Sequence, residues 1–257
     1  MSINGLEGRR AVVTGASRGI GKAIAKALAA AGCDCLLVAR SETRLRASAK
    51  EISKETGRSV TFHASDLSEK TGCEAAGRAA KKGNGPVDIL VNCAGATKGG
   101  QFAELADEDW IAGFALKFHG AVRLTRILWP SLKRSRGTVI NIGGAAAYSP
   151  TADFMIGGAV NVALEHFSKA LAETGLADDI NVNIIQPGMT VSDRMHELLE
   201  RQAAVKGISV EDALKEAEEA SGIRRLGRPK DIADLAVFLC LPAARHIHGV
   251  SVRVDGG

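Results

Sequence analysis

A glycine-rich segment near the start of the chain has the residue types and spacing of a phosphate-binding turn. The apolar run 11–13 leads into Thr14-Gly15-Ala16-Ser17-Arg18-Gly19-Ile20-Gly21, and a helical pattern follows. Glycine reaches backbone angles that are closed to other residues and lets a pyrophosphate approach the main chain. The free N–H groups at the amino end of a helix attract an anion. We therefore predict that this turn binds the phosphates of a dinucleotide.

The elements that position this turn follow from the hydrophobic period along the chain. Apolar runs predict strands at residues 10–14, 35–38, 59–64, 87–91, 138–142, 181–185 and 250–254. Apolar residues at helical spacing predict helices at 20–31, 42–56, 68–82, 104–134 and 163–174. Strands with continuous apolar runs suit a parallel sheet that is covered on both faces. The predicted fold is a single α/β domain over residues 1–257, a doubly wound parallel sheet with helices on both faces.

Composition and charge exclude several classes of function. The chain has 257 residues, of which 46% are hydrophobic, and this is enough to bury a full core. The net charge of +4 is small and the basic residues are scattered, so we expect no nucleic-acid partner. The sequence shows no signal-peptide pattern and no apolar run of membrane-spanning length, so we expect a cytoplasmic protein that binds no membrane. The five cysteines form no C-x-x-C pattern and have no nearby histidine pair, so we expect reduced thiols and no metal site.

Four further motifs accompany the glycine turn. Asn92-Cys93-Ala94-Gly95 follows the fourth predicted strand and Pro187-Gly188 follows the sixth. Gly227-Arg228-Pro229 opens the last helix, and Val254-Asp255-Gly256-Gly257 ends the sequence. In this order and spacing the chain resembles a classical member of the short-chain dehydrogenase/reductase family along essentially its whole length. The resemblance implies a Rossmann-like fold, an oxidoreductase activity on a small-molecule substrate and a homo-oligomer, with a tetramer as the expected assembly.

The end of the second predicted strand indicates which dinucleotide binds. A carboxylate there would bind a free ribose and repel a 2′-phosphate, whereas an arginine does the reverse. The strand ends Val38-Ala39-Arg40-Ser41, with no acid in this run, and in the family Arg18 faces the same region. The predicted cofactor is NADP(H); the alternative is that Arg40 is a solvated surface residue. The resemblance implies cofactor contacts from Gly15, Ser17, Arg18, Gly19, Ile20, Gly21, Arg40, Asp66, Leu67, Asn92, Ala94, Gly95, Pro187, Gly188 and Thr190.

The positions at which this family carries its catalytic groups hold other residues here. A serine usually follows the fifth strand, and a tyrosine and a lysine four residues apart lie on the next helix. These three positions hold Gly144, Gly157 and Asn161. The asparagine that is usual on the preceding long helix is replaced by Lys117. Because loss of a positioned general acid lowers a rate by roughly 10²–10⁴-fold, we expect little carbonyl reduction by the usual mechanism of the family.

Two residues support the hypothesis of a rebuilt site. Asparagine and lysine have exchanged places, so the ammonium of Lys117 could still reach the site, where it would lower a neighbouring pKa or hold a ribose hydroxyl. Tyr148 is the one tyrosine of the chain, so any phenolic acid must be this residue. The alternatives are that Lys117 points to solvent and that Tyr148 only packs on the rim of the pocket.

Two expectations concern the substrate pocket. Glycine at positions 144 and 157 leaves the space of a serine and of an aromatic ring, which predicts a wider pocket. The segment 193–221 is helical in pattern and matches the substrate lid of relatives. Its apolar residues either line the pocket or pack the lid itself: Leu198, Leu199, Val205, Ile208 and Leu214.

Three functions are compatible with the sequence. The first is an NADP(H)-dependent oxidoreductase with a rebuilt site that uses Lys117 and Tyr148. The second is a catalytically silent NADP-binding protein or a partner subunit in a hetero-oligomer. The third is a non-redox lyase or hydrolase on the same fold, and the intact nucleotide turn argues against it.

Overall fold

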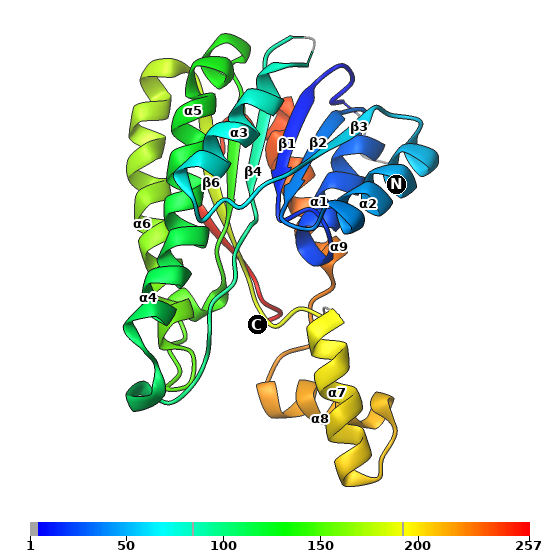
Figure 1. Cartoon of the computed structure of the whole chain (residues 1–257). Helices are drawn as coiled ribbons and strands as arrows, with labels where there is room; N and C mark the ends of the chain where they lie inside the picture. The colour runs from blue at the N-terminus through cyan, green and yellow to red at the C-terminus, as the bar shows by residue number, and fades with distance from the viewer. Residues whose placement is uncertain (1–4, 84, 192) are drawn as a thin grey trace.

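The seven strands that the structure describes form one parallel sheet. The computed structural model describes residues 5–83, 85–191 and 193–257. The strand order is β3-β2-β1-β4-β5-β6-β7, so the direction of winding reverses between β1 and β4 (Figure 1). This arrangement confirms the predicted doubly wound sheet. The strands are β1 (Arg10–Thr14), β2 (Asp34–Ala39), β3 (Val60–Ala64), β4 (Ile89–Asn92), β5 (Thr138–Ile142), β6 (Asn181–Pro187) and β7 (Ser251–Val254).

Helices cover both faces of this sheet (Figure 1). Side chains of a strand alternate between the two faces, so Val13 of β1 belongs to one apolar core and Val12 to the other. Each core is closed by three helices, which gives the three-layer architecture that the apolar strands predicted. The helices are α1 (Gly19–Ala30), α2 (Glu42–Thr56) and α9 (Pro229–Cys240) on the first face, and α3 (Lys70–Lys81), α5 (Gly120–Ser135) and α6 (Met155–Asp178) on the second.

The predicted helix at 104–134 is divided into three pieces. It consists of α4 (Asp107–Phe114), a π-helical turn (Ala115–His119) and α5. A π-helical turn widens the helix locally and often occurs at a functional site, and this one carries Lys117. Short 3-10 turns lie at Phe102–Glu104, Ala145–Ala147 and Pro242–Ala244.

Two helices project from the edge of the sheet at which the strands end (Figure 1). These are α7 (Asp193–Lys206) and α8 (Val210–Ser221), and they pack on each other through a small apolar cluster. Leu199 is buried in this cluster, Ile208 and Leu214 pack against it, and Val205 is 88% exposed. The side chain of Leu198 lies outside the described residues. Most of these apolar residues therefore stabilise the helix pair, and the lid role of the segment stays a prediction.

Two possible features are not found in the part of the chain that the structure describes. No helix there has both the length and the apolar character that crossing a bilayer requires. No group of three or more histidine, cysteine, aspartate or glutamate residues there could hold a metal ion.

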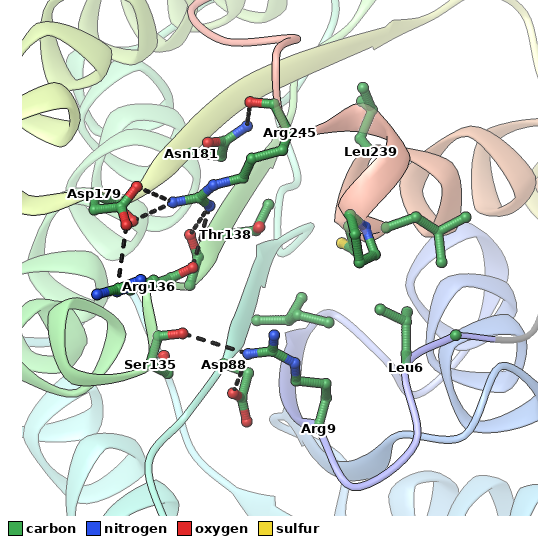
Figure 2. Close-up of a pocket in the computed structure, with 16 residues that line it drawn as sticks. Leu6, Arg9, Asp88, Ser135, Arg136, Thr138, Asp179, Asn181, Leu239 and Arg245 are labelled. Atoms are coloured by element: carbon green, nitrogen blue, oxygen red, sulfur yellow. Dashed lines mark hydrogen bonds and ion pairs between the residues drawn. The ribbon is translucent and has the colours of Figure 1, made fainter.

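A cavity of about 310 Å³ lies at the amino-terminal ends of β1, β4, β5 and β6 (Figure 2). At its rim, Arg136 directly follows α5 and Asp179 directly follows α6, and both residues have left-handed backbones, with φ of 52° and 55°. The guanidinium of Arg245 donates to the carbonyl oxygens of Arg136, Gly137 and Asp179, and it pairs with the Asp179 carboxylate at 2.5 Å. A cation at the carbonyl ends of two helices satisfies groups that have no partner within the helices. Arg245 therefore fixes both helix ends beside β5.

We expect Arg245→Met to lower the free energy of unfolding by about 2 kcal/mol, because the apolar stem is kept while three carbonyl groups lose a charged donor. Urea unfolding measures this loss. The control is Lys230→Met, which breaks an exposed pair with Asp234 one helical turn away and should cost less than about 0.5 kcal/mol. Equal losses in the two variants would contradict the role given to Arg245.

Candidate functional site

The glycine turn has a backbone that other residues would not fit. Gly15 and Gly19 have φ of 67° and 56°, in the left-handed region. A Cβ atom on Gly15 would lie 2.9 Å from the carbonyl oxygen of Cys93, and one on Gly21 would lie 2.5 Å from the carbonyl oxygen of Gly15. The hydroxyl of Thr14 accepts hydrogen bonds of 2.9 Å from the two backbone N–H groups that follow β4. The turn is thereby fixed at the switch point between β1 and β4, where doubly wound sheets bind their ligands.

Charged residues follow β2 and β3 on the same edge of the sheet. Arg18 in the turn and Arg40 after β2 are both exposed. Hydrogen bonds from Ser68 hold the pKa of Asp66 below its usual value, and the positive charge of Arg40 contributes in the same direction. Arg40 and Asp66 are therefore close enough to share one surface, as a contact with the ribose and the adenine of one ligand requires. Whether they make that contact stays a prediction.

Some of the predicted cofactor residues have a structural role. The side-chain amide of Asn92 donates to Thr125 Oγ1 and to Asn141 Oδ1, each at 2.9 Å, so both of its N–H donors are used within the protein. Leu67 is 3% exposed and belongs to the core. The remaining residues lie on the carboxyl edge of the sheet, namely Ser17 and Ile20 in and after the turn, Ala94 and Gly95 after β4, and Pro187, Gly188 and Thr190 at and after the end of β6.

Lys117 enters this edge from the π-helical turn. Its ammonium donates a hydrogen bond of 2.9 Å to the carbonyl oxygen of Gly143, directly after β5. Its stem passes over Gly95, where a Cβ atom would lie 2.9 Å from Lys117 Cδ. Burial lowers the pKa of Lys117 to about 8, and the thiol of Cys93 opposes this shift. The alternative that Lys117 points to solvent is therefore wrong.

Asn161 lies beside Gly144 on the first turns of α6. A Cβ atom on Gly144 would lie 2.7 Å from Asn161 Nδ2, so the amide fills space that a serine at position 144 would need. Asn161 is 4% exposed, and its Oδ1 atom is buried and accepts no hydrogen bond from the described residues. A buried acceptor without a donor costs free energy, so a ligand hydroxyl or N–H group would stabilise this site.

The position of Gly157 is also filled. A Cβ atom there would lie 2.0 Å from the ring of Phe154, the residue before α6, and that ring is partly exposed. The space that we expected to be open beside Gly144 and Gly157 is thus occupied by an amide and an aromatic ring. The expectation of a wider pocket is wrong at these two positions, because neighbouring side chains move into space that the glycines vacate.

Tyr148 lies against α6 and β7. Its hydroxyl donates to Glu165 Oε1 at 2.5 Å and lies 2.5 Å from Ser251 Oγ. Burial and the neighbouring carboxylate raise the pKa of Tyr148, and the guanidinium of Arg253 lies 5.6 Å from the ring centre. The phenol is therefore held by protein groups and is a weak acid in this state. Its partner Glu165 also contacts Gln186, which accepts a hydrogen bond from the backbone N–H of Gly144.

The sequence did not point to Gln186 or Glu165. Gln186 is fully buried near the end of β6, and its Oε1 accepts a hydrogen bond of 2.6 Å from the backbone N–H of Gly144. Its Nε2 lies 3.4 Å from Glu165 Oε2 on α6. The available indication was a glutamine directly after the apolar residues Ile184 and Ile185, where a strand of a covered parallel sheet usually carries another apolar residue.

The short chain dehydrogenase model matches residues 9–203 of the chain. The uncharacterized oxidoreductase YvaG of Bacillus subtilis (strain 168) is 32% identical over 263 residues, which cover 100% of this chain and 98% of that protein. L-Sorbose reductase from Gluconobacter frateurii, solved with NADPH and L-sorbose, is 33% identical with a TM-score of 0.95 and coverage of 100% and 98%. An NADPH-bound short chain oxidoreductase from Pseudomonas aeruginosa PAO1 containing an atypical catalytic center is 26% identical with a TM-score of 0.91 and coverage of 99% and 98%.

The burial of Lys117 predicts a pH-dependent stability difference. Its ordinary pKa of 10.5 applies to the unfolded chain, whereas the folded value is about 8. Between these two values the unfolded chain binds a proton that the folded chain has lost, so the free energy of unfolding gains a contribution that rises with pH. Relative to the Lys117→Met variant, we expect the parent to gain roughly 2–3 kcal/mol between about pH 7 and about pH 10. Urea unfolding at both pH values tests this.

The matched control for this titration is Lys50→Met, which replaces an exposed lysine of α2. Its difference from the parent should stay constant over the same range. A constant difference for Lys117→Met as well would show that its ammonium is solvated.

Proposed function

Because the chain belongs to the short-chain dehydrogenase family, we propose that it is an NADP(H)-dependent oxidoreductase that acts on a carbonyl or the corresponding alcohol. Lys117 and Asn161 are the polar groups of its site. The positions that hold serine and tyrosine in the family supply no side-chain chemistry here, since both are glycine.

The residues at the switch point fit the cofactor. Glycine at positions 15 and 21 allows the close backbone packing of the turn, since a Cβ atom at either position would lie within 3 Å of a backbone oxygen. The N–H groups of such a turn would bind a pyrophosphate. Exposed Arg18 and Arg40 supply cations for a 2′-phosphate. The unpaired Oδ1 atom of Asn161 would accept a hydrogen bond from a ribose hydroxyl. When bound, NADPH supplies the hydride that reduces a carbonyl carbon. The solved relatives that contain NADPH support the same assignment.

The partly buried ammonium of Lys117 is the observation that carries the proposal. One of its three N–H donors is held by the Gly143 carbonyl, and the others can stabilise the negative charge that develops on a substrate oxygen. A pKa of about 8 suits a general acid at neutral pH, because the group is charged and yet gives up its proton readily. The Pseudomonas relative supports the idea that this fold holds NADPH around a centre other than the usual one.

Loss of NADPH absorbance in the presence of ketones tests the proposed reaction. The similarity to L-sorbose reductase makes ketoses the first substrates to screen, followed by smaller ketones and β-ketoesters. Tight NADPH binding by calorimetry without turnover of any of them would instead support a catalytically silent NADP-binding protein. Assembly as a homo-oligomer stays a prediction.

We expect Lys117→Met to lower the turnover rate by roughly 10²–10⁴-fold and to leave NADPH affinity within a few fold, because the ammonium acts on the reacting oxygen. The reduction rate of the parent should fall as pH rises through about 8, the pKa of Lys117. Lys133→Met, on the exposed end of α5, is the control and should keep the parent rate. If Tyr148→Phe lost the activity while Lys117→Met kept it, the phenol would be the acid.

We expect Arg40→Asp to weaken NADPH binding by roughly 10-fold or more and to favour NADH, since a carboxylate repels the 2′-phosphate and accepts from a free ribose hydroxyl. Calorimetry with both cofactors measures the change. Lys50→Asp alters the net charge equally from the exposed surface of α2 and should keep the NADPH preference. Unchanged preference in Arg40→Asp would place that arginine away from the ribose.

A further inference from the structure

A series of hydrogen bonds joins Lys117 to Glu165 across the end of the sheet. The ammonium of Lys117 donates to the carbonyl oxygen of Gly143 at 2.9 Å. The N–H on the other side of that peptide group, which belongs to Gly144, donates to Gln186 Oε1 at 2.6 Å. The other end of the Gln186 amide donates to Glu165 Oε2 at 3.4 Å. We refer to the Gly143–Gly144 peptide group and the Gln186 amide together as the amide bridge.

The two amides of this bridge are aligned in the same direction. Each presents its oxygen toward the ammonium and its N–H toward the carboxylate. A positive charge at one end and a negative charge at the other polarise both amides in the same sense, which strengthens every hydrogen bond of the series. Since Gln186 is fully buried, water does not screen this polarisation there.

The bridge depends on glycine at position 143. A Cβ atom there would lie 2.1 Å from Gln186 Oε1 and would push the amide away from the Gly144 N–H. The hydrogen bond from the Gly144 N–H to Gln186 therefore requires glycine at position 143.

The charged groups at each end of the bridge are few. At Lys117, the described titratable group that acts on the ammonium is the thiol of Cys93, whose own pKa burial raises to about 12. At Glu165, Oε1 accepts from Tyr148 and lies 3.6 Å from the ammonium of Lys169 on the next turn of α6. The Glu165 side chain is only 13% exposed. Next to Tyr148, Arg253 is paired with Asp255.

We propose that Glu165 and Gln186 are positioning residues that keep Lys117 in its ammonium form at the site, with Glu165 acting through the amide bridge. Desolvation alone favours the neutral amine, and the polarised carbonyl of Gly143 counteracts it. The link of this device to catalysis rests on the proposed function. The effect on the ionisation of Lys117 does not, because it is a property of the protein without cofactor or substrate.

The test is the titration of Lys117 in the full-length protein without cofactor. Lysine labelled with ¹³C at Cε reports its own protonation by NMR, and the signal missing from Lys117→Met identifies this residue. In Glu165→Gln the charge is lost and the bridge is kept. In Gln186→Met the bridge is broken and the charge is kept. We expect both variants to lower the pKa of Lys117 by about half a pH unit or more.

A third variant changes the pKa in the opposite direction. Gln186→Glu combined with Glu165→Gln moves the carboxylate one amide closer to Lys117 and keeps the same side-chain types in the pair. The pKa of Lys117 should then rise above that of the parent, since the negative charge lies nearer. Tyr148→Phe is the control, because it removes a partner of Glu165 and leaves the bridge and the carboxylate in place. The pKa of Lys117 in this variant should stay at the parent value.

The results separate the possible explanations. An unchanged pKa in Gln186→Met together with a lowered one in Glu165→Gln would mean that the carboxylate acts directly through space, and would overturn the bridge. If Gln186→Met does not fold, the double variant decides, and a pKa at or below the parent value there overturns the proposal. Shifts in the expected directions in a protein that reduces no ketone would support the bridge and contradict the proposed function.

Discussion

The ammonium of Lys117 is partly buried and donates to the carbonyl oxygen of Gly143, and the candidate site is arranged around this contact. Burying a charge costs free energy unless hydrogen bonds replace its water. Three elements combine to make the contact. The π-helical turn directs the side chain inward, Gly95 leaves room for its stem, and the end of β5 presents a carbonyl. Loss of any one of them would leave the charge unpaired or expel it to solvent.

Three glycines of the site leave space that neighbouring side chains fill. Gly144 admits the amide of Asn161, and Gly143 admits the amide of Gln186. Gly157 admits the ring of Phe154. The candidate site is therefore closely packed, with an ammonium, two amides and a nearby carboxylate. Such a set of groups can stabilise negative charge on oxygen.

The carboxyl and amino-terminal ends of the strands have different roles. At the carboxyl edge, the strand order reverses between β1 and β4, and the glycine turn lies at this switch point. At the amino edge, Arg245 satisfies the carbonyl ends of α5 and α6 (Figure 2). The strands between these edges hold the helices that carry Lys117 and Asn161 at fixed positions. The candidate site at the carboxyl ends of the strands therefore depends on a sheet and helices that Arg245 stabilises at the opposite, amino-terminal ends.

Local patterns in the sequence were sufficient to predict the strands and the glycine turn. The strands at 10–14 and 138–142 were predicted with the bounds that the structure shows, because each is a buried apolar run that ends at glycine. Gly15, Gly19 and Gly21 were predicted to form a turn, since glycines at this spacing before a helix are typical of a phosphate-binding turn. These features depend on residues that are close together in the chain, so the sequence by itself determined them.

The contents of the site were decided by the tertiary structure. The direction of Lys117 could not be predicted from helical periodicity, because the period breaks at the π-helical turn. The filled space at Gly157 depends on the position of Phe154, and the amide bridge joins Gly144 on one strand end to Gln186 on another and to Glu165 on a helix. Such contacts join residues that are distant in the chain, or depend on side-chain packing, and they leave no repeating pattern. Only the packing of the folded chain brings these groups together.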